Sequence, residues 1–286
     1  MLSTDLVLSG PPFVHLPLLD RMAPARDAGF TGMSLMPGDV WGLERQGMAA
    51  SDIAARMADH GLSVMEIDCT ACWLPAHRVA GDDAPMATLL RSLTPERVVE
   101  TAARIGAPSL TVVEMMGMTP SLDEAAEAFA HVCDLAAGHG LRAHIEFLPF
   151  GGIPDLATAW AIVQAAGCAN GGLTLDSWHF FRSGSSLELL RSIPGDRIHT
   201  VQINDAPTRA SDDLMRETMN GRMLPGTGSF DLPGFIAAID ATGSTAPLSV
   251  EIFSSELAQQ PMADAIRDWA GSALSVVAQA RKEART

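Results

Sequence analysis

Four oxygen-bearing side chains stand at or near the ends of short apolar segments in the second half of the sequence. Three are carboxylates and one is an amide: Glu146 in segment 141–148, Asp176 in segment 173–180, Gln202 in segment 198–205 and Glu251 in segment 248–253. An acid at the end of a buried strand costs free energy unless it is paired or holds a metal. Because hard divalent cations prefer oxygen ligands, the four predict a site for one Mg²⁺ or Mn²⁺ ion, with Co²⁺ or Zn²⁺ as alternatives.

Charge repulsion is the reason to expect a cation. Three carboxylates that converge cannot all ionise without one, and an octahedral ion with four protein ligands keeps two positions for a substrate. In the alternative interpretation the four are unrelated polar residues at strand ends, which cap helices or pair with arginines. The metal site therefore requires a fold that brings them to one place.

The spacing of the four segments indicates such a fold. Each segment is apolar and follows a helix-like stretch, and the first three lie roughly the ~30 residues of one βα unit apart. We therefore expect consecutive parallel strands whose carboxyl ends present the ligands on one face. Four further strands are predicted upstream, at residues 5–9, 30–35, 62–68 and 109–114.

Helical periodicity separates these strands. The predicted helices cover residues 16–28, 52–59, 95–105, 121–137, 155–166, 187–192, 232–241 and 263–281, and loops are expected at 37–41, 72–86 and 206–228. Eight strands alternating with helices predict a single (β/α)₈ TIM barrel of the α/β class, as one domain over residues 1–286. A doubly wound sheet is disfavoured, because SGPPF after the first strand is not a glycine-rich phosphate turn.

Other side chains near the strand ends could contact a substrate. His179, three residues after Asp176, suits an acid–base or hydrogen-bonding role, and Arg222 lies in a long loop that can carry it over the barrel mouth. Glu114 ends the fourth strand, and Trp178 follows the sixth, where it can wall a pocket. The plainer alternatives are a loop histidine, a solvated arginine, a carboxylate in a solvent network and a core tryptophan.

Four more residues have structural explanations. His144 either orients a neighbouring ligand or packs in the core, and Asp205 is expected to anchor a loop. Cys69 and Cys72 form a C-x-x-C pair, but the sequence offers no second pair with zinc-site spacing. We therefore favour two small buried residues at a strand end over a zinc or redox pair.

Composition limits the classes of function. The net charge of −15 argues against a nucleic-acid surface, and the only lysine, Lys282, lies in a polar tail, which disfavours a buried Schiff base. No stretch approaches the ~18 apolar residues of a membrane span, and MLSTDLVLSG lacks the basic flank of a signal peptide. We expect a cytoplasmic protein with a small-molecule substrate and neither nucleic acid nor membrane as partner. Whether it forms a homo-oligomer is left open.

The runs LDSWHFFRSG, RIHTVQINDA, GRMLPGTGSFDL and LSVEIF resemble the xylose isomerase-like TIM-barrel superfamily, whose members are often called sugar phosphate isomerases/epimerases. The resemblance is close over residues 141–253 and rests on pattern in the first half. It implies a divalent metal held by the four oxygen ligands, proton transfer by Glu146 and Glu251, and substrate contacts from His179 and Arg222. Many sugar epimerases have His at the position of Gln202, whereas Gln is similar to 3-dehydroshikimate dehydratases.

The implied reaction is proton abstraction next to a carbonyl, with the metal stabilising the enediolate. If the proton returns to the substrate, the enzyme is an isomerase or epimerase of a keto-sugar or related polyol. We favour this reaction from the sequence. Loss of a β-hydroxyl describes a dehydratase of a cyclic hydroxy-ketone of the 3-dehydroshikimate or inosose type. The alternative from a different class is a non-catalytic sugar-binding barrel. A sugar phosphate is not expected, because the sequence has no phosphate-cradling loop.

Overall fold

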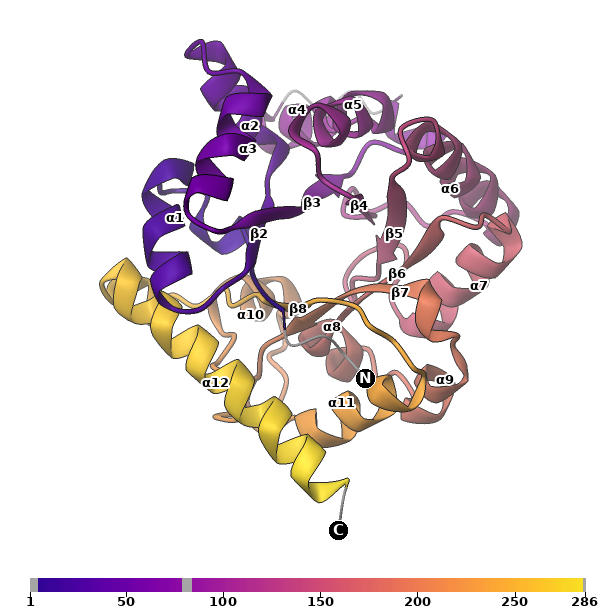
Figure 1. Ribbon diagram of the computed structural model, residues 1–286. Coiled ribbons are helices and arrows are strands. Elements are labelled where there is room, and N and C mark those ends of the chain that lie inside the picture. The colour runs from indigo at the N-terminus through magenta and orange to yellow at the C-terminus, as the bar shows by residue number, and fades with distance from the viewer. Residues whose placement is uncertain (1–4, 79–83, 285–286) are drawn as a thin grey trace.

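The structure is a computed structural model that describes residues 5–78 and 84–284. Eight parallel strands form a closed barrel in chain order, and helices surround it (Figure 1). The predicted (β/α)₈ TIM barrel is therefore confirmed. Within the described ranges, none of the helices has both the length and the apolar character needed to span a membrane.

The barrel strands are short and almost wholly buried. They are β1 (Leu6–Leu8), β2 (Gly32–Leu35), β3 (Ser63–Thr70), β4 (Ser109–Val113), β5 (Arg142–Glu146), β6 (Gly171–Asp176), β7 (Ile198–Ile203) and β8 (Leu248–Val250). The barrel closes where β1 pairs with β8, with Val7 in register with Ser249. All eight predicted strands exist, and most are shorter than their apolar segments.

The helices pack around the outside of the barrel. They are α1 (Leu18–Asp27), α2 (Pro37–Arg45), α3 (Ala50–Asp59), α4 (Pro85–Ser92), α5 (Pro95–Ile105), α6 (Leu122–Ala137), α7 (Leu156–Ala166), α8 (Ser177–Arg182), α9 (Leu187–Ser192), α10 (Leu214–Asn220), α11 (Leu232–Ala241) and α12 (Met262–Glu283). Short 3₁₀ turns are η1 (Pro11–Phe13), η2 (Pro75–Arg78), η3 (Gly195–Arg197) and η4 (Leu257–Gln259). The long α12 lies against both α1 and α11, so the last helix packs beside the first (Figure 1).

Local sequence signals explain where several helices begin and end. The side chains of Ser121 and Asp155 accept the N–H groups of Glu124 and Thr158, respectively, and so cap the first turns of α6 and α7. At the other end, α5 stops at Gly106, whose φ of 76° is a conformation that glycine adopts without a steric cost.

The structure corrects two of the predicted loops. Residues 37–41 begin α2, and residues 206–228 contain α10, whose first turn is capped by Asp213. Pro37 occupies the first turn of α2. Backbone N–H groups in the first turn have no partner within the helix, so a proline, which lacks this group, can begin the helix there. The predicted loop at 72–86 contains η2 and the first residues of α4, and residues 79–83 of that loop lie outside the described residues.

A polar layer occupies the barrel interior, where TIM barrels usually carry bulky apolar side chains. Thr200 donates a hydrogen bond to Glu66 (Oγ1–Oε2 2.6 Å), and His144 Nδ1 lies 2.7 Å from the hydroxyl oxygen of Thr174. The other ring nitrogen of His144 is 3.5 Å from Glu66 Oε2. Burial raises the pKa of Glu66 to about 7. The contacts of His144 therefore favour the core role over orientation of a ligand.

Candidate metal centre at the barrel mouth

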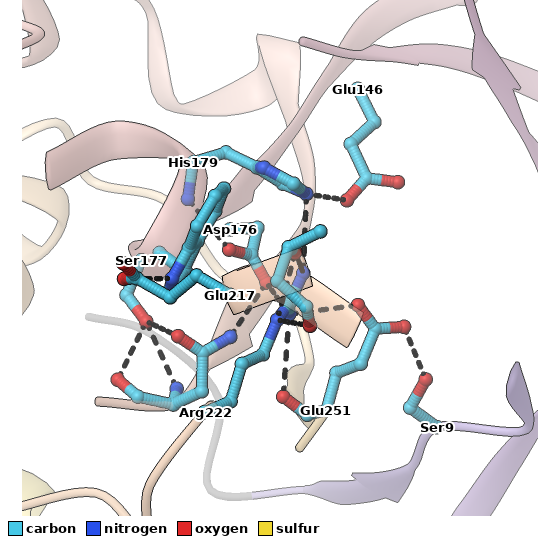
Figure 2. A network of polar contacts seen from close by, with 11 residues as sticks. Ser9, Glu146, Asp176, Ser177, His179, Glu217, Arg222 and Glu251 are labelled. Carbon is cyan, nitrogen blue, oxygen red and sulfur yellow. Dashed lines mark hydrogen bonds and ion pairs between the residues drawn. The ribbon is translucent and has the colours of Figure 1, made fainter. Parts of the chain in front are cut away.

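Three of the residues singled out in the sequence converge at the carboxyl ends of β5 and β6. Glu146, Asp176 and His179 each offer a ligand atom, all three atoms lie within 4.8 Å of one another, and all three residues are buried. Figure 2 shows the imidazole of His179 pointing at the carboxylate of Glu146, with Nε2 at 3.4 Å from Oε1. Two carboxylates and a histidine in this arrangement can hold a divalent cation.

Asp176 is oriented by three donors. It caps α8 through a bond from the backbone N–H of His179 to Oδ1 (2.9 Å), while Oδ2 accepts from Asn204 Nδ2 (2.8 Å) and Arg222 Nη1 (2.9 Å). A strand that ends in Asp and runs directly into a helix places the carboxylate on the helix N-terminus, where negative charge is favoured. One of the three donors therefore belongs to the same strand–helix segment as Asp176, and the other two come from later parts of the chain.

Glu251 joins the cluster through Arg222 rather than by direct contact with the other acids. Arg222 Nη1 lies 3.1 Å from Glu251 Oε2, and Ser9 Oγ donates to Oε1 at 2.7 Å. Figure 2 shows Glu251 across Arg222 from Asp176, with Ser9 on its far side. The residue directly after β1 thus orients a predicted ligand.

Gln202 lies on β7 directly opposite Asp176 in the register of β6 and β7. The side chain is fully buried, and neither its amide oxygen nor its amide nitrogen has a hydrogen-bond partner. A buried amide without partners is costly, and a ligand bound at its oxygen would remove part of that cost. His179 Nδ1 is also buried without a partner.

The electrostatics fit a dication. Burial raises the pKa of Glu146 well above its ordinary value, and the neighbouring charges of Glu251 and Asp176 raise it further. Burial also raises the pKa of Glu251, although Arg222 opposes the rise. Three ionised carboxylates and one guanidinium carry a net charge of −2, which one divalent cation would balance. The residues present therefore fit the predicted metal.

Arg222 is held inside the site. Its Nη2 donates to the hydroxyl of Thr218 at 2.8 Å, and its Nε donates to the backbone oxygen of the same residue at 3.1 Å. The side chain is only 2% exposed, so the alternative of a solvated arginine is wrong. Its predicted contact with a substrate stays a prediction.

His179 is neutral in this environment, because burial lowers the pKa of its imidazole to about 4. Its Nε2 lies 3.4 Å from both Glu146 Oε1 and Arg222 Nη2. A neutral imidazole beside a carboxylate can accept a proton or donate its own N–H, which keeps both predicted roles of this residue available.

Trp178 and Glu114 have protein partners of their own. The indole N–H of Trp178 bonds to Glu217, and the side chain is completely buried in α8 rather than in a loop. The carboxylate of Glu114 accepts the backbone N–H groups of Met116 and Met118 at 3.0 and 2.9 Å, and also that of Gly152. The predicted substrate contacts of both residues stay predictions. The carboxylate of Glu114 binds backbone N–H groups of two loops.

The expectation for Asp205 is confirmed. Its Oδ2 accepts the N–H groups of Gly226 and Gly228, each at 3.0 Å, and Oδ1 accepts that of Phe230 at 3.0 Å. Both cysteines of the C-x-x-C pair are free and buried, which agrees with the structural interpretation.

Sequence reasoning missed several residues that shape the site. Asn204 and Ser9 orient two predicted ligands, and Glu217 holds α10 against α8. Asp68, at the end of β3, is buried, and burial together with Glu146 and other acids raises its pKa well above the ordinary value. The run EID of β3 was the available signal, because Glu66 and Asp68 are two residues apart and so share one face of the strand, and an acid near a strand end is the pattern used for the later strands.

Comparisons with known proteins agree with this geometry. Residues 22–273 match the family described as "Xylose isomerase-like TIM barrel". Over 130 residues, 45% of this chain, the sequence is 37% identical to a 3-dehydroshikimate dehydratase of Pseudomonas aeruginosa, and the match spans 20% of that protein. Over 166 residues, 56% of this chain, it is 30% identical to an inosose isomerase of Bacillus velezensis, of which 58% is covered.

A solved structure supports the fold over the whole barrel. The IolI protein, crystallised with a bound zinc atom, superposes with a TM-score of 0.82 at 19% sequence identity. The superposition covers 96% of this chain and 98% of the other. At this identity the likeness establishes a shared fold.

Proposed function

The chain belongs to the xylose isomerase-like TIM barrel family, and from this premise we propose that it is an enzyme dependent on one divalent cation. In this proposal it removes a proton beside the carbonyl group of a small polyhydroxylated ketone. The observation that carries the proposal is the convergence of Glu146, Asp176 and His179 with the unpartnered amide of Gln202. Burying these charged and polar groups costs folding free energy, and a bound cation would offset that cost.

The proposed ligands are Glu146, Asp176, Gln202 and Glu251. Bound there, a divalent cation supplies positive charge that stabilises the negative charge developing on the substrate oxygen when the proton leaves. An all-oxygen ligand set favours Mn²⁺ or Mg²⁺, and the cation identity is part of the proposal.

The protein's own groups have distinct roles in this scheme. Glu146 and Glu251 belong to different strands, and either can take the α-proton. His179, whose Nε2 lies 3.4 Å from Glu146, exchanges a proton with a substrate hydroxyl or with that carboxylate. Arg222 holds the carboxylates of Asp176 and Glu251 and presents its guanidinium to a substrate oxygen. The enclosed position of these side chains excludes water from the reacting carbon.

Dehydration is the outcome that we propose after proton removal. Two features favour it: the ligand position on β7 carries Gln202, which resembles 3-dehydroshikimate dehydratases, and a dehydratase of that name is 37% identical over 130 residues. The substrate would be a cyclic hydroxy-ketone of the 3-dehydroshikimate type, from which the β-hydroxyl leaves as water. The sequence alone favoured an isomerase or epimerase over a dehydratase, and this proposal reverses that order.

Isomerisation of an inosose is the second candidate. It is supported by the inosose isomerase that matches this chain over a longer stretch, 166 residues, at 30% identity. In that reaction the proton returns to the substrate and no hydroxyl is lost. The chain spans about a fifth of the dehydratase and somewhat more than half of the isomerase, so neither whole-protein activity transfers without a test.

Solvent deuterium tests the shared first step. Metal-depleted protein and protein reloaded with Mn²⁺ are incubated in D₂O with 3-dehydroshikimate and with an inosose. We expect deuterium at the α-carbon, or loss of the α-proton to solvent as water is eliminated, only with Mn²⁺, and a rate about 100-fold or more lower in E146Q and E251Q. A non-catalytic sugar-binding barrel would bind these compounds without any exchange.

The two outcomes are distinguished by the product. Dehydration creates a new conjugated double bond and therefore a new near-ultraviolet absorbance, whereas isomerisation leaves the number of double bonds unchanged. The exposed Glu188→Gln variant serves as the matched control for a loss of charge, since Glu188 lies on α9 away from the cluster. Exchange without metal, or equal exchange in E146Q and wild type, would refute the proposal.

A further inference from the structure

The segment between β7 and α11 carries Arg222 and is attached to the barrel on both sides of it. After Arg222, Asp205 binds the backbone N–H groups of Gly226 and Gly228. Before Arg222, the buried Glu217 of α10 forms the second attachment. The position of Arg222 therefore depends on both carboxylates, and neither is among the predicted ligands.

Glu217 connects α10 to α8. Its Oε1 accepts the indole N–H of Trp178 at 3.1 Å and Nε of Arg182 at 2.6 Å, and its Oε2 accepts the backbone N–H of Ser211. The pair with Arg182 is shielded, because both side chains are 7% exposed. The carboxylate of Glu217 thus fixes the orientation of Trp178 and holds the segment that contains Ser211 against α8.

The ring of Trp178 lies against both His179 and Arg222, whose own side chains also approach each other, with Nε2 3.4 Å from Nη2. Its ring meets the imidazole of His179 edge-on, with the centroids 5.3 Å apart and an interplanar angle of 89°. The guanidinium carbon of Arg222 lies 5.6 Å from the centroid of the same ring. Figure 2 shows the side chains of Glu217, His179 and Arg222 around Asp176.

The next residue of α10 completes the connection. Thr218 follows Glu217 in the chain, and its hydroxyl accepts from Arg222 Nη2 at 2.8 Å. Displacement of Glu217 would therefore move Arg222 by two routes, through the indole ring and through the helix backbone. A displacement of about 1 Å in a catalytic group can cost on the order of 100-fold in rate.

We propose that Glu217 is a positioning residue that fixes Arg222 and His179 by holding the ring of Trp178, which lies against both groups. This role rests on the proposed function of the site, because it assigns Arg222 and His179 to the reaction. Glu217 itself touches neither the substrate nor the cation. Its removal should leave the metal site intact and misplace the two groups beside it.

Three variants test this role. E217Q keeps an oxygen for the indole N–H but loses the charge that pairs with Arg182, and W178F removes the N–H donor while keeping an aromatic ring. D213A removes the exposed cap of the same helix, whose carboxylate accepts the N–H of Arg216, and does not touch Trp178. It is therefore the matched control for a general weakening of α10.

We expect kcat to fall about 10–100-fold in E217Q and in W178F, with KM and the calorimetric Mn²⁺ affinity within about threefold of wild type. D213A should keep kcat within about threefold. A wild-type kcat in E217Q, or a parallel loss of Mn²⁺ affinity and kcat, would overturn the positioning role. If E217Q does not fold, W178F decides by the same criteria.

A second measurement does not depend on activity. In protein with isotope-labelled histidine rings, the His179 signal is assigned by its absence in H179Q, and ring currents make it sensitive to the orientation of Trp178. We expect this signal to shift in E217Q and W178F and to stay in place in D213A. An unmoved signal in E217Q refutes the coupling. If wild-type protein exchanges no proton with any ketone, the proposed function fails, and the histidine spectrum still decides the coupling.

Discussion

Asp176 and Gln202 are opposite each other on β6 and β7 in direct register, yet only the side chain of Asp176 has hydrogen-bond partners. Asp176 receives bonds from a backbone N–H, an amide and a guanidinium, while the amide of Gln202 receives none. Neighbouring strands thus present a fully oriented carboxylate beside an unsatisfied carbonyl oxygen. The proposed role of Gln202 as a ligand would account for this asymmetry.

The first prediction concerns Gln202→Leu, which should have opposite effects with and without metal. In metal-free protein it removes two buried unpaired polar atoms, and the free energy of unfolding should rise by about 1–3 kcal/mol. With Mn²⁺ present it removes a ligand, and the metal affinity should fall about 10–100-fold. Chemical denaturation and calorimetry measure the two effects.

A matched control for this prediction is Thr111→Val. The hydroxyl of Thr111 is also buried without a partner, but it lies on β4 within the barrel. T111V should stabilise the metal-free protein and leave the response to Mn²⁺ unchanged. If Q202L binds Mn²⁺ as tightly as wild type, Gln202 is not a ligand.

The second prediction concerns Arg222→Met. The guanidinium is the buried counter-ion of Asp176 and Glu251, so its removal leaves two carboxylates uncompensated. Breaking such a pair should lower the free energy of unfolding of the metal-free protein by about 3–5 kcal/mol. The exposed pair of Arg267 and Asp264 supplies the control, since R267M should change stability by less than about 0.5 kcal/mol. Equal unfolding free energies in R222M and R267M would contradict this account of Arg222.

The third prediction is a pH dependence set by Glu66. Burial raises the pKa of its carboxyl group from 4.5 to about 7. The folded state then keeps a proton that the unfolded state releases, so stability should fall as pH rises from about 4.5 to 7 and become independent of this group above that range. The shift corresponds to a loss of about 3 kcal/mol.

Glu66→Gln isolates this effect, because other buried acids also titrate. Metal-free wild type and E66Q are unfolded with denaturant at intervals from pH 4.5 to 8. The free energy of unfolding of wild type relative to that of E66Q should fall as pH rises from about 4.5 to 7, since glutamine cannot ionise. Parallel stability curves for the two proteins would show that Glu66 does not keep its proton on folding.

The barrel was predictable largely because its four later strands repeat one local pattern. An apolar, β-branched segment that ends in an acid or an amide recurs at about the βα spacing, and parallel strands bring such ends to one face. Asp176 also has its own local signal, because the same carboxylate caps the helix that follows it. The sequence therefore predicted Asp176 and Gln202 on one face of the barrel, and the structure shows them in direct register.

The partners of the site residues were not predictable in the same way. The ion pair between Arg222 and Asp176 joins residues 46 positions apart, and the bond from Ser9 to Glu251 joins residues 242 apart. No local spacing encodes such contacts, since they depend on barrel closure and on the path of α10. The error at residues 37–41 has a different, local cause, because a proline suits both a loop and the first turn of a helix, and Pro37 stands in the first turn of α2.

The last prediction concerns Glu114, for which a substrate contact was expected. Burial alone would raise the pKa of its carboxyl group, but hydrogen bonds from His77 and from backbone N–H groups lower it below the ordinary value. A carboxylate stabilised by these donors holds the loops after β4 and β5 together. Glu114→Gln should therefore lower the free energy of unfolding by about 1.5–3 kcal/mol, because a charged acceptor is lost.

The kinetics of E114Q distinguish the two roles of this residue. If Glu114 only holds the loops, KM at a temperature well below unfolding should stay within about threefold of wild type, while the stability falls. A KM increase of about tenfold or more, with unfolding free energy unchanged, would establish the substrate contact instead. Exposed Glu124→Gln on α6 is the control, because the backbone N–H of Glu124 takes part in the cap of that helix while its side chain is exposed. Its unfolding free energy and KM should both match wild type, so that any change in E114Q is specific to the buried carboxylate.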